Sequence, residues 1–183
     1  MDFQQSKTFA NLQIAYENEL QTSTKFEMFG NQAREEVLIE IGEAFDIISR
    51  NEIFIANRLR TLIKGRVTDT EENLQEAKLD EENAANNIYL AFSQIAQEEG
   101  YNDIASLFNG IANIKLNHIL TLQTFQTNLQ NNELFCKPQE GVWICMGCGN
   151  ILTGFCAPDI CPICQFPQGY YRLLSYYSAN PPV

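Results

Sequence analysis

Four cysteines near the C-terminus constrain this chain more than any other feature of its sequence. They form a C-x2-C-x12-C-x2-C array made of Cys145, Cys148, Cys161 and Cys164. Two thiolates three residues apart bind one ion when a tight turn aims both sulfurs the same way, and two such pairs give a tetrahedral site. Gly149 follows the first pair and readily adopts the positive φ of such a turn, whereas Gln165 occupies the matching place after the second pair. The array therefore predicts a small metal-binding domain.

A pair of disulfides is the alternative use of these four cysteines, and it is typical of secreted proteins. Residues 1–9 lack the basic segment and the apolar stretch of a signal peptide. We therefore expect a reducing, cytoplasmic environment and a metal site. Cys136 and Cys156 lie outside the array, and no histidine or acid adjoins either of them. We expect each to be a free thiol that is packed or on the surface.

The charge of the chain is unevenly distributed. Its 183 residues are 45% hydrophobic, which is enough for one medium and one small domain. The formal net charge of −11 argues against nucleic acid as a partner. Residues 1–135 carry 21 Asp and Glu against 10 Lys and Arg, whereas residues 136–183 carry 2 of each kind. The acidic part suits a cation-binding protein or a solvated surface, and no apolar run is long enough to span a membrane.

Residues 9–130 repeat apolar side chains at helical spacing, without the alternation that marks strands. Gly65 and Gly100 fall where helices would end, and Thr70 begins a segment that resembles a helix N-terminus. The polar run 128–133 marks the end of the last helix. The pattern predicts an all-α four-helix bundle.

The second pair of predicted helices repeats the first at an offset of 62 to 63 residues. Corresponding positions include Glu19 and Glu81, Phe45 and Phe108, Glu52 and Lys115, and Ile55 and His118. A bundle of two related hairpins places such positions around a pseudo-twofold axis.

Ionisable side chains recur on the face of each predicted helix that should meet the core. They are Glu19, Glu52, Glu81, Lys115 and His118. A buried carboxylate is costly unless it is paired or bound to metal, so three carboxylates beside a lysine and a histidine predict a polar site. A divalent cation or bound protons would balance the remaining negative charge. Two alternatives stay open: mis-phased surface acids, and a salt-bridge cluster in which Lys115 takes the place of a metal.

The chain resembles the rubrerythrin family from about Asn11 to Leu174. In that family a ferritin-like helical bundle precedes a rubredoxin domain. The motifs that carry the resemblance are Val142-Trp143-Ile144-Cys145, Cys148-Gly149, Ala157-Pro158, Cys161-Pro162 with Cys164, and Pro167-Gln168 with Tyr170. The resemblance implies iron at the four thiolates, with zinc as the main alternative, and we expect Trp143 and Tyr170 to bury that iron.

In the helical part, the resemblance implies metal ligands and catalytic residues at Glu19, Glu52, Glu81 and His118. Three other ligand positions of the family differ in this chain. Ile55 and Lys115 replace a His and a Glu of its two Glu-x-x-His motifs, and Ala84 replaces a Glu one turn after Glu81. An ammonium in place of a bridging carboxylate repels two ions that would lie only about 3.5–4 Å apart. We therefore expect a degenerate site, with zero to two metal ions in the bundle.

These features predict a ferritin-like four-helix bundle over residues 9–133 and a rubredoxin-like domain over residues 134–183. The leading hypothesis is a rubrerythrin-like iron protein that transfers electrons and reduces peroxide or dioxygen if the bundle binds metal. Whether the chain is an enzyme depends on that metal. The resemblance also implies a head-to-tail homodimer with an unknown electron donor. Two other hypotheses are a non-catalytic scaffold that has lost its bundle metals and a zinc-ribbon interaction module.

Overall fold

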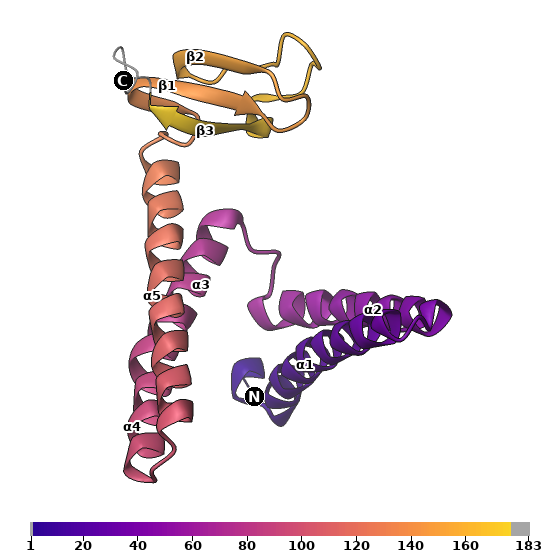
Figure 1. Ribbon diagram of the computed structural model, residues 1–183. Helices are drawn as coiled ribbons and strands as arrows, with labels where there is room; N and C mark the ends of the chain where they lie inside the picture. Colours follow the sequence, from indigo (N-terminus) through magenta and orange to yellow (C-terminus); the bar gives the residue numbers. More distant parts are fainter. Residues whose placement is uncertain (1, 177–183) are drawn as a thin grey trace. The chain divides into compact units, whose positions relative to one another are not determined.

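The computed structural model describes residues 2–176. Residues 177–183, the last part of the predicted rubredoxin-like domain, lie outside this range. Over the described range, four helical rods precede a small three-stranded sheet (Figure 1). This confirms the predicted fold class of a helical part followed by a small cysteine-bearing domain. The chain divides into two compact units, one ending at Asp69 and one starting at Thr70. Within the described residues, no helix is both long and apolar enough to cross a membrane.

The first unit is a hairpin of α1 (Lys7–Glu35) and α2 (Ile39–Lys64). Small residues are buried between the two helices, namely Ser23, Gly30, Ala33, Gly42 and Ala56. A Cβ added to Gly42 would lie 3.2 Å from the carbonyl oxygen of Gly30, so the absence of side chains lets the two backbones approach closely. The helix α2 ends at Gly65, which has a φ of 74°. This is the end that the sequence predicts.

The second unit begins with another helical hairpin. One rod consists of α3 (Thr70–Asn83), the π-helical segment η2 (Ala84–Tyr89) and α4 (Leu90–Glu98), and it packs against α5 (Asn102–Gln130). Small residues again fill the contact, namely Ala85, Ser93, Ala96, Ala105 and Ala112. The Ser93 hydroxyl donates a hydrogen bond to the Ala105 carbonyl at 2.9 Å. The same kind of close helix contact therefore supports both hairpins.

A cluster of three aromatic rings in each hairpin confirms the internal repeat. The first hairpin holds Phe26, Phe29 and Phe45, and the second holds Tyr89, Phe92 and Phe108. Ring centroids are 6.2, 5.7 and 5.9 Å apart in the first cluster and 6.3, 6.2 and 5.6 Å apart in the second. Residues that correspond in sequence thus pack in the same way.

The segment η2 explains why the repeat offset changes from 62 to 63 residues. Glu81 lies 62 residues after Glu19, whereas Tyr89 lies 63 residues after Phe26. The extra residue falls between Glu81 and Tyr89, where the rod is π-helical, while α1 is a continuous α-helix over the matching stretch. A π-helical turn accommodates one inserted residue without breaking the helix.

Each hairpin leaves an apolar stripe exposed. The exposed fraction is 48% for Ile55 in the first hairpin, and it is 46% for Phe92 and 51% for Ile95 in the second. These side chains belong to the stripes that the sequence assigns to the core of a bundle. The packing of the two hairpins against each other stays a prediction. The boundary between the helical domain, ending at residue 133, and the rubredoxin-like domain, starting at residue 134, also stays a prediction.

The small sheet consists of β1 (Cys136–Cys145), β2 (Ile151–Cys156) and β3 (Tyr171–Tyr176) in the antiparallel order β2-β1-β3. A short 3-10 helix, η3 (Gln168–Tyr170), precedes β3. Trp143 is fully buried, and its indole N–H donates to the Gly154 carbonyl at 3.0 Å. The core of this domain consists of Trp143, Ala157, Tyr171 and two of the four predicted ligands.

Candidate metal centres

The four cysteines of the array meet at one end of the sheet. Their sulfur atoms all lie within 4.8 Å of one another, with Cys145 and Cys164 at 3.7 Å and Cys148 and Cys161 also at 3.7 Å. Four thiolates bound tetrahedrally about 2.3 Å from one ion lie about 3.8 Å from each other. The arrangement therefore fits a single tetrahedral metal ion. Within the described residues, no other group of three or more His, Cys, Asp or Glu side chains comes together in this way.

Two matching turns aim the sulfurs at one point. The Gly149 N–H donates to the Cys145 carbonyl at 2.8 Å, and the Gln165 N–H donates to the Cys161 carbonyl at 3.0 Å. Gly149 has a φ of 78° and Gln165 a φ of 61°. The second turn thus places a non-glycine residue in the left-handed region, as the sequence predicts. The metal site must hold that strain, which costs about 1–2 kcal/mol.

The thiol groups differ in their ease of ionisation. The backbone N–H of Cys164, the Tyr171 hydroxyl and the backbone N–H of Ile163 together lower the pKa of Cys161 to about 6. The backbone N–H of Phe166 favours ionisation of Cys164, but burial and the neighbouring sulfurs outweigh it and raise the pKa of Cys164 to about 12. Four thiolates at this spacing repel one another, so a cation is what allows all four to ionise together.

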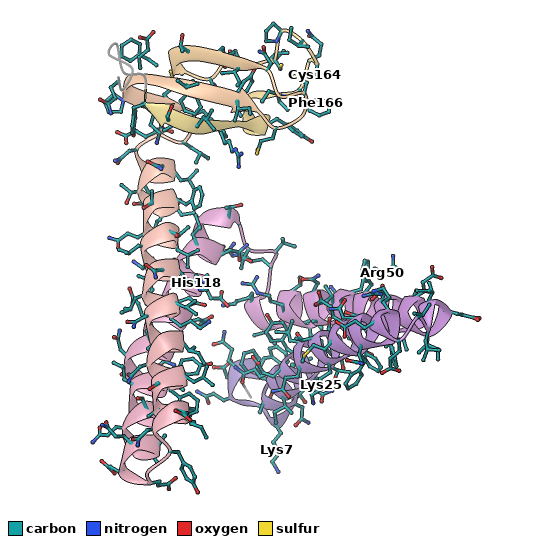
Figure 2. All side chains as sticks on the ribbon, viewed as in Figure 1. Lys7, Lys25, Arg50, His118, Cys164 and Phe166 are labelled. Atoms are coloured by element: carbon teal, nitrogen blue, oxygen red, sulfur yellow. A yellow bond between two sulfur atoms is a disulfide. The ribbon has the colours of Figure 1, made fainter. Side chains whose placement is uncertain are left out.

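The burial of the site is uneven. Cys145 and Cys161 are buried, Cys164 is half-buried and Cys148 is exposed. The Cys164 and Phe166 side chains lie in the loop between β2 and β3, at the same end of the sheet (Figure 2). A buried metal with an exposed ligand edge permits electron exchange with a partner while most of the site stays out of water.

Tyr171 covers the site in place of Tyr170. We expected Trp143 and Tyr170 to bury the metal; Trp143 packs in one core with Cys145 and Cys161, but Tyr170 is 44% exposed and its ring lies against Phe166. Tyr171 is 3% exposed, and its hydroxyl is buried without a well-formed hydrogen bond among the described residues. Its interaction with the Cys161 thiol raises the pKa of Tyr171. The prediction for Tyr170 was wrong because Tyr170 is the last residue of the 3-10 helix η3, whereas Tyr171 is the first residue of β3.

The second hairpin brings three predicted side chains together. The Lys115 ammonium lies 2.9 Å from Oε1 of Glu81, and Nδ1 of His118 lies 3.0 Å from Oε2 of the same carboxylate. Partial burial opposes ionisation of Glu81, but the hydrogen bonds and charges of Lys115 and His118 outweigh it and lower the pKa of Glu81. His118 lies on α5 (Figure 2). Both oxygens of the Glu81 carboxylate are therefore occupied by cationic or hydrogen-bonding partners.

The first hairpin holds the other two predicted side chains. A hydrogen bond between the side chains of Glu19 and Glu52, burial, and the like charge of Glu19 all raise the pKa of Glu52. Two neighbouring carboxyl groups that share a hydrogen bond hold one proton between them. The structure thus brings together Glu19 with Glu52 and Glu81 with His118, each pair within one hairpin. The joining of both pairs into one metal site stays a prediction.

Comparisons with known proteins agree with this geometry. Residues 143–172 match the family model described as rubrerythrin, rubredoxin-like domain, and this range contains all four cysteines. The chain is 29% identical over 181 residues to rubrerythrin of Nitratidesulfovibrio vulgaris, covering 92% of this chain and 95% of that protein. The chain is rubrerythrin-like. It is also 29% identical over 186 residues to rubrerythrin-1 of Clostridium acetobutylicum, covering 93% of this chain and 95% of that protein.

Solved structures of nigerythrin also match the rubrerythrin-like chain. A mixed-valence form is 21% identical, with a TM-score of 0.35, over 92% of this chain and 86% of that chain. The fully reduced, all-ferrous form is 20% identical, with a TM-score of 0.36, over 92% of this chain and 87% of that chain.

Two cysteines outside the rubredoxin-like array form a disulfide that we did not expect. Cys136 and Cys156 are bonded to each other, so the prediction of two free thiols was wrong. They are partners across the strands β1 and β2. Reading residues 136–156 as a β-hairpin that closes around the first cysteine pair would have suggested the pairing.

Proposed function

We propose that this rubrerythrin-like chain is an electron-transfer protein with a rubredoxin-type iron at Cys145, Cys148, Cys161 and Cys164. The four-sulfur geometry carries the proposal, and the match of residues 143–172 to the rubredoxin-like domain of rubrerythrin supports iron over zinc. Iron held by four thiolates supplies one-electron transfer at a potential set by hydrogen bonds to sulfur and by burial. In this chain, Trp143 and Tyr171 exclude water from the buried side.

We further propose that, if the helical hairpins bind metal, they receive these electrons and reduce peroxide or dioxygen. Reduction of one peroxide molecule to two water molecules consumes two electrons and two protons. The hydrogen bond to Glu19 raises the pKa of Glu52, which favours its protonated form, and His118 lies against Glu81 within hydrogen-bond distance. These side chains are suited to supply protons to a substrate oxygen. Closure of the two hairpins into a bundle over residues 9–133 would place both pairs in one site.

The Lys115–Glu81 ion pair limits how many metal ions the helical part can bind. The ammonium occupies Oε1 of Glu81, and a divalent ion at that oxygen would have to displace it. We propose that the bundle holds fewer than two metal ions. The same observation favours a second candidate function, in which the helical part has lost its metals and serves as a scaffold for the four-cysteine domain.

Metal analysis of the purified protein tests both proposals. The full chain is loaded with ferrous iron without oxygen, desalted and oxidised, and its iron content and visible spectrum are measured. We expect a red protein that bleaches on reduction and holds about one iron per chain. A content near three irons per chain would contradict the metal-poor helical site. A colourless protein that retains zinc in preference to iron would replace the electron-transfer proposal with a zinc-ribbon module.

A cytoplasmic location and a head-to-tail homodimer complete the proposal. A dimer of this kind would bring the four-cysteine domain of one chain toward the hairpins of the other, where the Glu81 cluster lies. Sedimentation of the iron-loaded protein tests the dimer, and we expect twice the chain mass of 20.8 kDa. The electron donor stays unknown.

A further inference from the structure

The Cys136–Cys156 disulfide closes the open end of the hairpin whose turn carries the first pair of metal ligands. Cys136 is the first residue of β1 and Cys156 the last residue of β2, and the two lie opposite each other in the register. The next paired residues are Gly141 and Gly154, so residues 137–140 bulge out of the ladder. Backbone pairing is therefore interrupted beside the disulfide. The bond itself holds this end of the hairpin.

The residues next to the disulfide join the linker after α5 to the core of the metal domain. The Ala157 N–H donates to the Phe135 carbonyl at 2.8 Å, and the Gln168 side-chain amide donates to the Ala157 carbonyl at 2.6 Å. Ala157 is 2% exposed, and Phe135 packs against the same core. The disulfide thus fastens the linker at a point where the core of the four-cysteine domain begins.

The position of the disulfide couples it to the metal site. Cys136 and Cys156 are 20 positions apart in sequence, and the segment between them includes Cys145 and Cys148, whereas Cys161 lies five residues beyond Cys156. A cross-link of this kind limits how far the first ligand pair can move from the second when the domain opens. A metal leaves a four-thiolate site only when its ligands separate, so the cross-link should slow metal loss.

We propose that Cys136 and Cys156 are a reversible dithiol–disulfide pair, a redox modification site separate from the four metal ligands, whose closure retains the metal. Cys156 is exposed and Cys136 is half-buried, so small oxidants and reductants reach the pair. In a reducing compartment the two thiols are the resting state. The proposal does not depend on peroxide reduction in the hairpins.

The chemistry of closure balances with hydrogen peroxide as the oxidant. The Cys156 thiol loses its proton and attacks one peroxide oxygen, the O–O bond breaks, a sulfenic acid forms, and the other oxygen takes up the released proton and leaves as water. The Cys136 thiolate then attacks the sulfenic sulfur, the disulfide forms, and a second water leaves. A phosphine reductant reverses closure, because its phosphorus takes an oxygen from water as the disulfide accepts two electrons and two protons.

The test compares zinc release from the oxidised and reduced forms of the full chain. Zinc is the probe because it does not change its oxidation state and shields the four ligand thiols. Protein loaded with zinc is treated with one equivalent of hydrogen peroxide or with tris(2-carboxyethyl)phosphine and then mixed with the coloured chelator 4-(2-pyridylazo)resorcinol. We expect the oxidised form to release zinc roughly tenfold more slowly. Mass spectrometry after alkylation counts the free thiols in each form.

The double variant Cys136→Ser/Cys156→Ser is the matched control. It keeps all four ligands, and we expect its zinc release to equal that of the reduced natural chain under both treatments. Equal release rates for the oxidised and reduced natural chain would overturn the proposal. So would alkylation of both Cys136 and Cys156 after peroxide treatment, because the pair would then not have closed.

Discussion

Val37 occupies the same position in the turn of the first hairpin as Gly100 does in the second. The two residues lie 63 positions apart, and both have positive φ values, 63° for Val37 and 87° for Gly100. The following residue closes each turn in the same way, since the Leu38 N–H donates to the Ala33 carbonyl and the Tyr101 N–H donates to the Ala96 carbonyl, both at 2.8 Å. A β-branched residue is strained in this conformation, whereas glycine is not.

Replacing Val37 with glycine should therefore stabilise the first hairpin. Relief of the left-handed strain favours the folded state, and the greater freedom of glycine in the unfolded chain offsets part of the gain. We expect the free energy of unfolding of Val37→Gly to rise by roughly 0.5–1 kcal/mol in urea titration. Gly100→Val is the reciprocal control. A Cβ at Gly100 would meet no atom within 4 Å, so any loss of stability there arises from the backbone conformation.

The buried hydroxyl of Tyr171 should tune the potential of the four-cysteine iron. The Tyr171 hydroxyl lowers the pKa of the Cys161 thiol, and a group that favours negative charge on sulfur also favours the more negative, reduced state of a thiolate site and raises its reduction potential. We expect Tyr171→Phe to bind iron normally and to have a more negative potential in a spectroelectrochemical titration. Tyr170→Phe is the control, because Tyr170 is 44% exposed and should leave the potential unchanged. An equal shift in both variants would show that Tyr171 does not act through Cys161.

The raised pKa of Glu52 predicts a pH-dependent stability. The pKa of Glu52 is raised above its ordinary value of 4.5 in the folded state, so the pair adds stability below pH 4.5 and loses it as the pH rises through the raised pKa. Glu52→Gln keeps a hydrogen-bond donor at every pH. We expect this variant to match the natural chain near about pH 4 and to be more stable near about pH 8.

Urea unfolding at the two pH values measures this difference. Glu17→Gln is the control, because Glu17 lies exposed on the same helix as Glu19. A Glu52→Gln variant that is no more stable than the natural chain at the higher pH would show that the two carboxyl groups do not repel each other in the folded protein.

Restoring three ligand types should increase metal binding by the helical hairpins. The triple variant Ile55→His, Ala84→Glu and Lys115→Glu supplies two carboxylates and an imidazole and removes the ammonium from Glu81. We expect more iron per chain by elemental analysis and faster peroxide turnover. Lys115→Met is the comparison variant, since it removes the ammonium from Glu81 without adding a ligand, and we expect it to gain less iron than the triple variant. No gain of iron in the triple variant would contradict the assignment of these ligand positions.

The sequence predicts the repeated hairpins and the four-sulfur site because both follow from short-range patterns. Helical spacing and the glycines at 65 and 100 define the helix ends, and the two Cys-x-x-Cys turns define the metal ligands. The left-handed conformation of Gln165 also follows from its position relative to Gly149. Local patterns of this kind need no knowledge of how distant segments pack.

The features that sequence reasoning missed depend on strand register. The Cys136–Cys156 bond depends on the pairing of β1 with β2, in which the two cysteines lie opposite each other despite the register shift over residues 137–140. We predicted Tyr170 at the four-cysteine site, but Tyr171 lies there, and this difference depends on where β3 begins. In the helical part, the sequence identifies the side chains of both carboxylate clusters but not their partners. The binding of Lys115 and His118 to opposite oxygens of Glu81 is visible only in three dimensions.

The π-helical segment η2 lies where a polar cluster of side chains gives way to an aromatic cluster along a single helical rod. Before it, α3 carries Glu81, which contacts Lys115 and His118, whereas Tyr89 at the end of η2 and Phe92 beyond it join the aromatic cluster with Phe108. The π-helical segment accommodates one added residue between the two clusters, and the rod stays helical on both sides of it. The polar cluster and the aromatic cluster share no residue, so substitutions in the polar cluster change the chemistry of this hairpin and leave its aromatic packing in place.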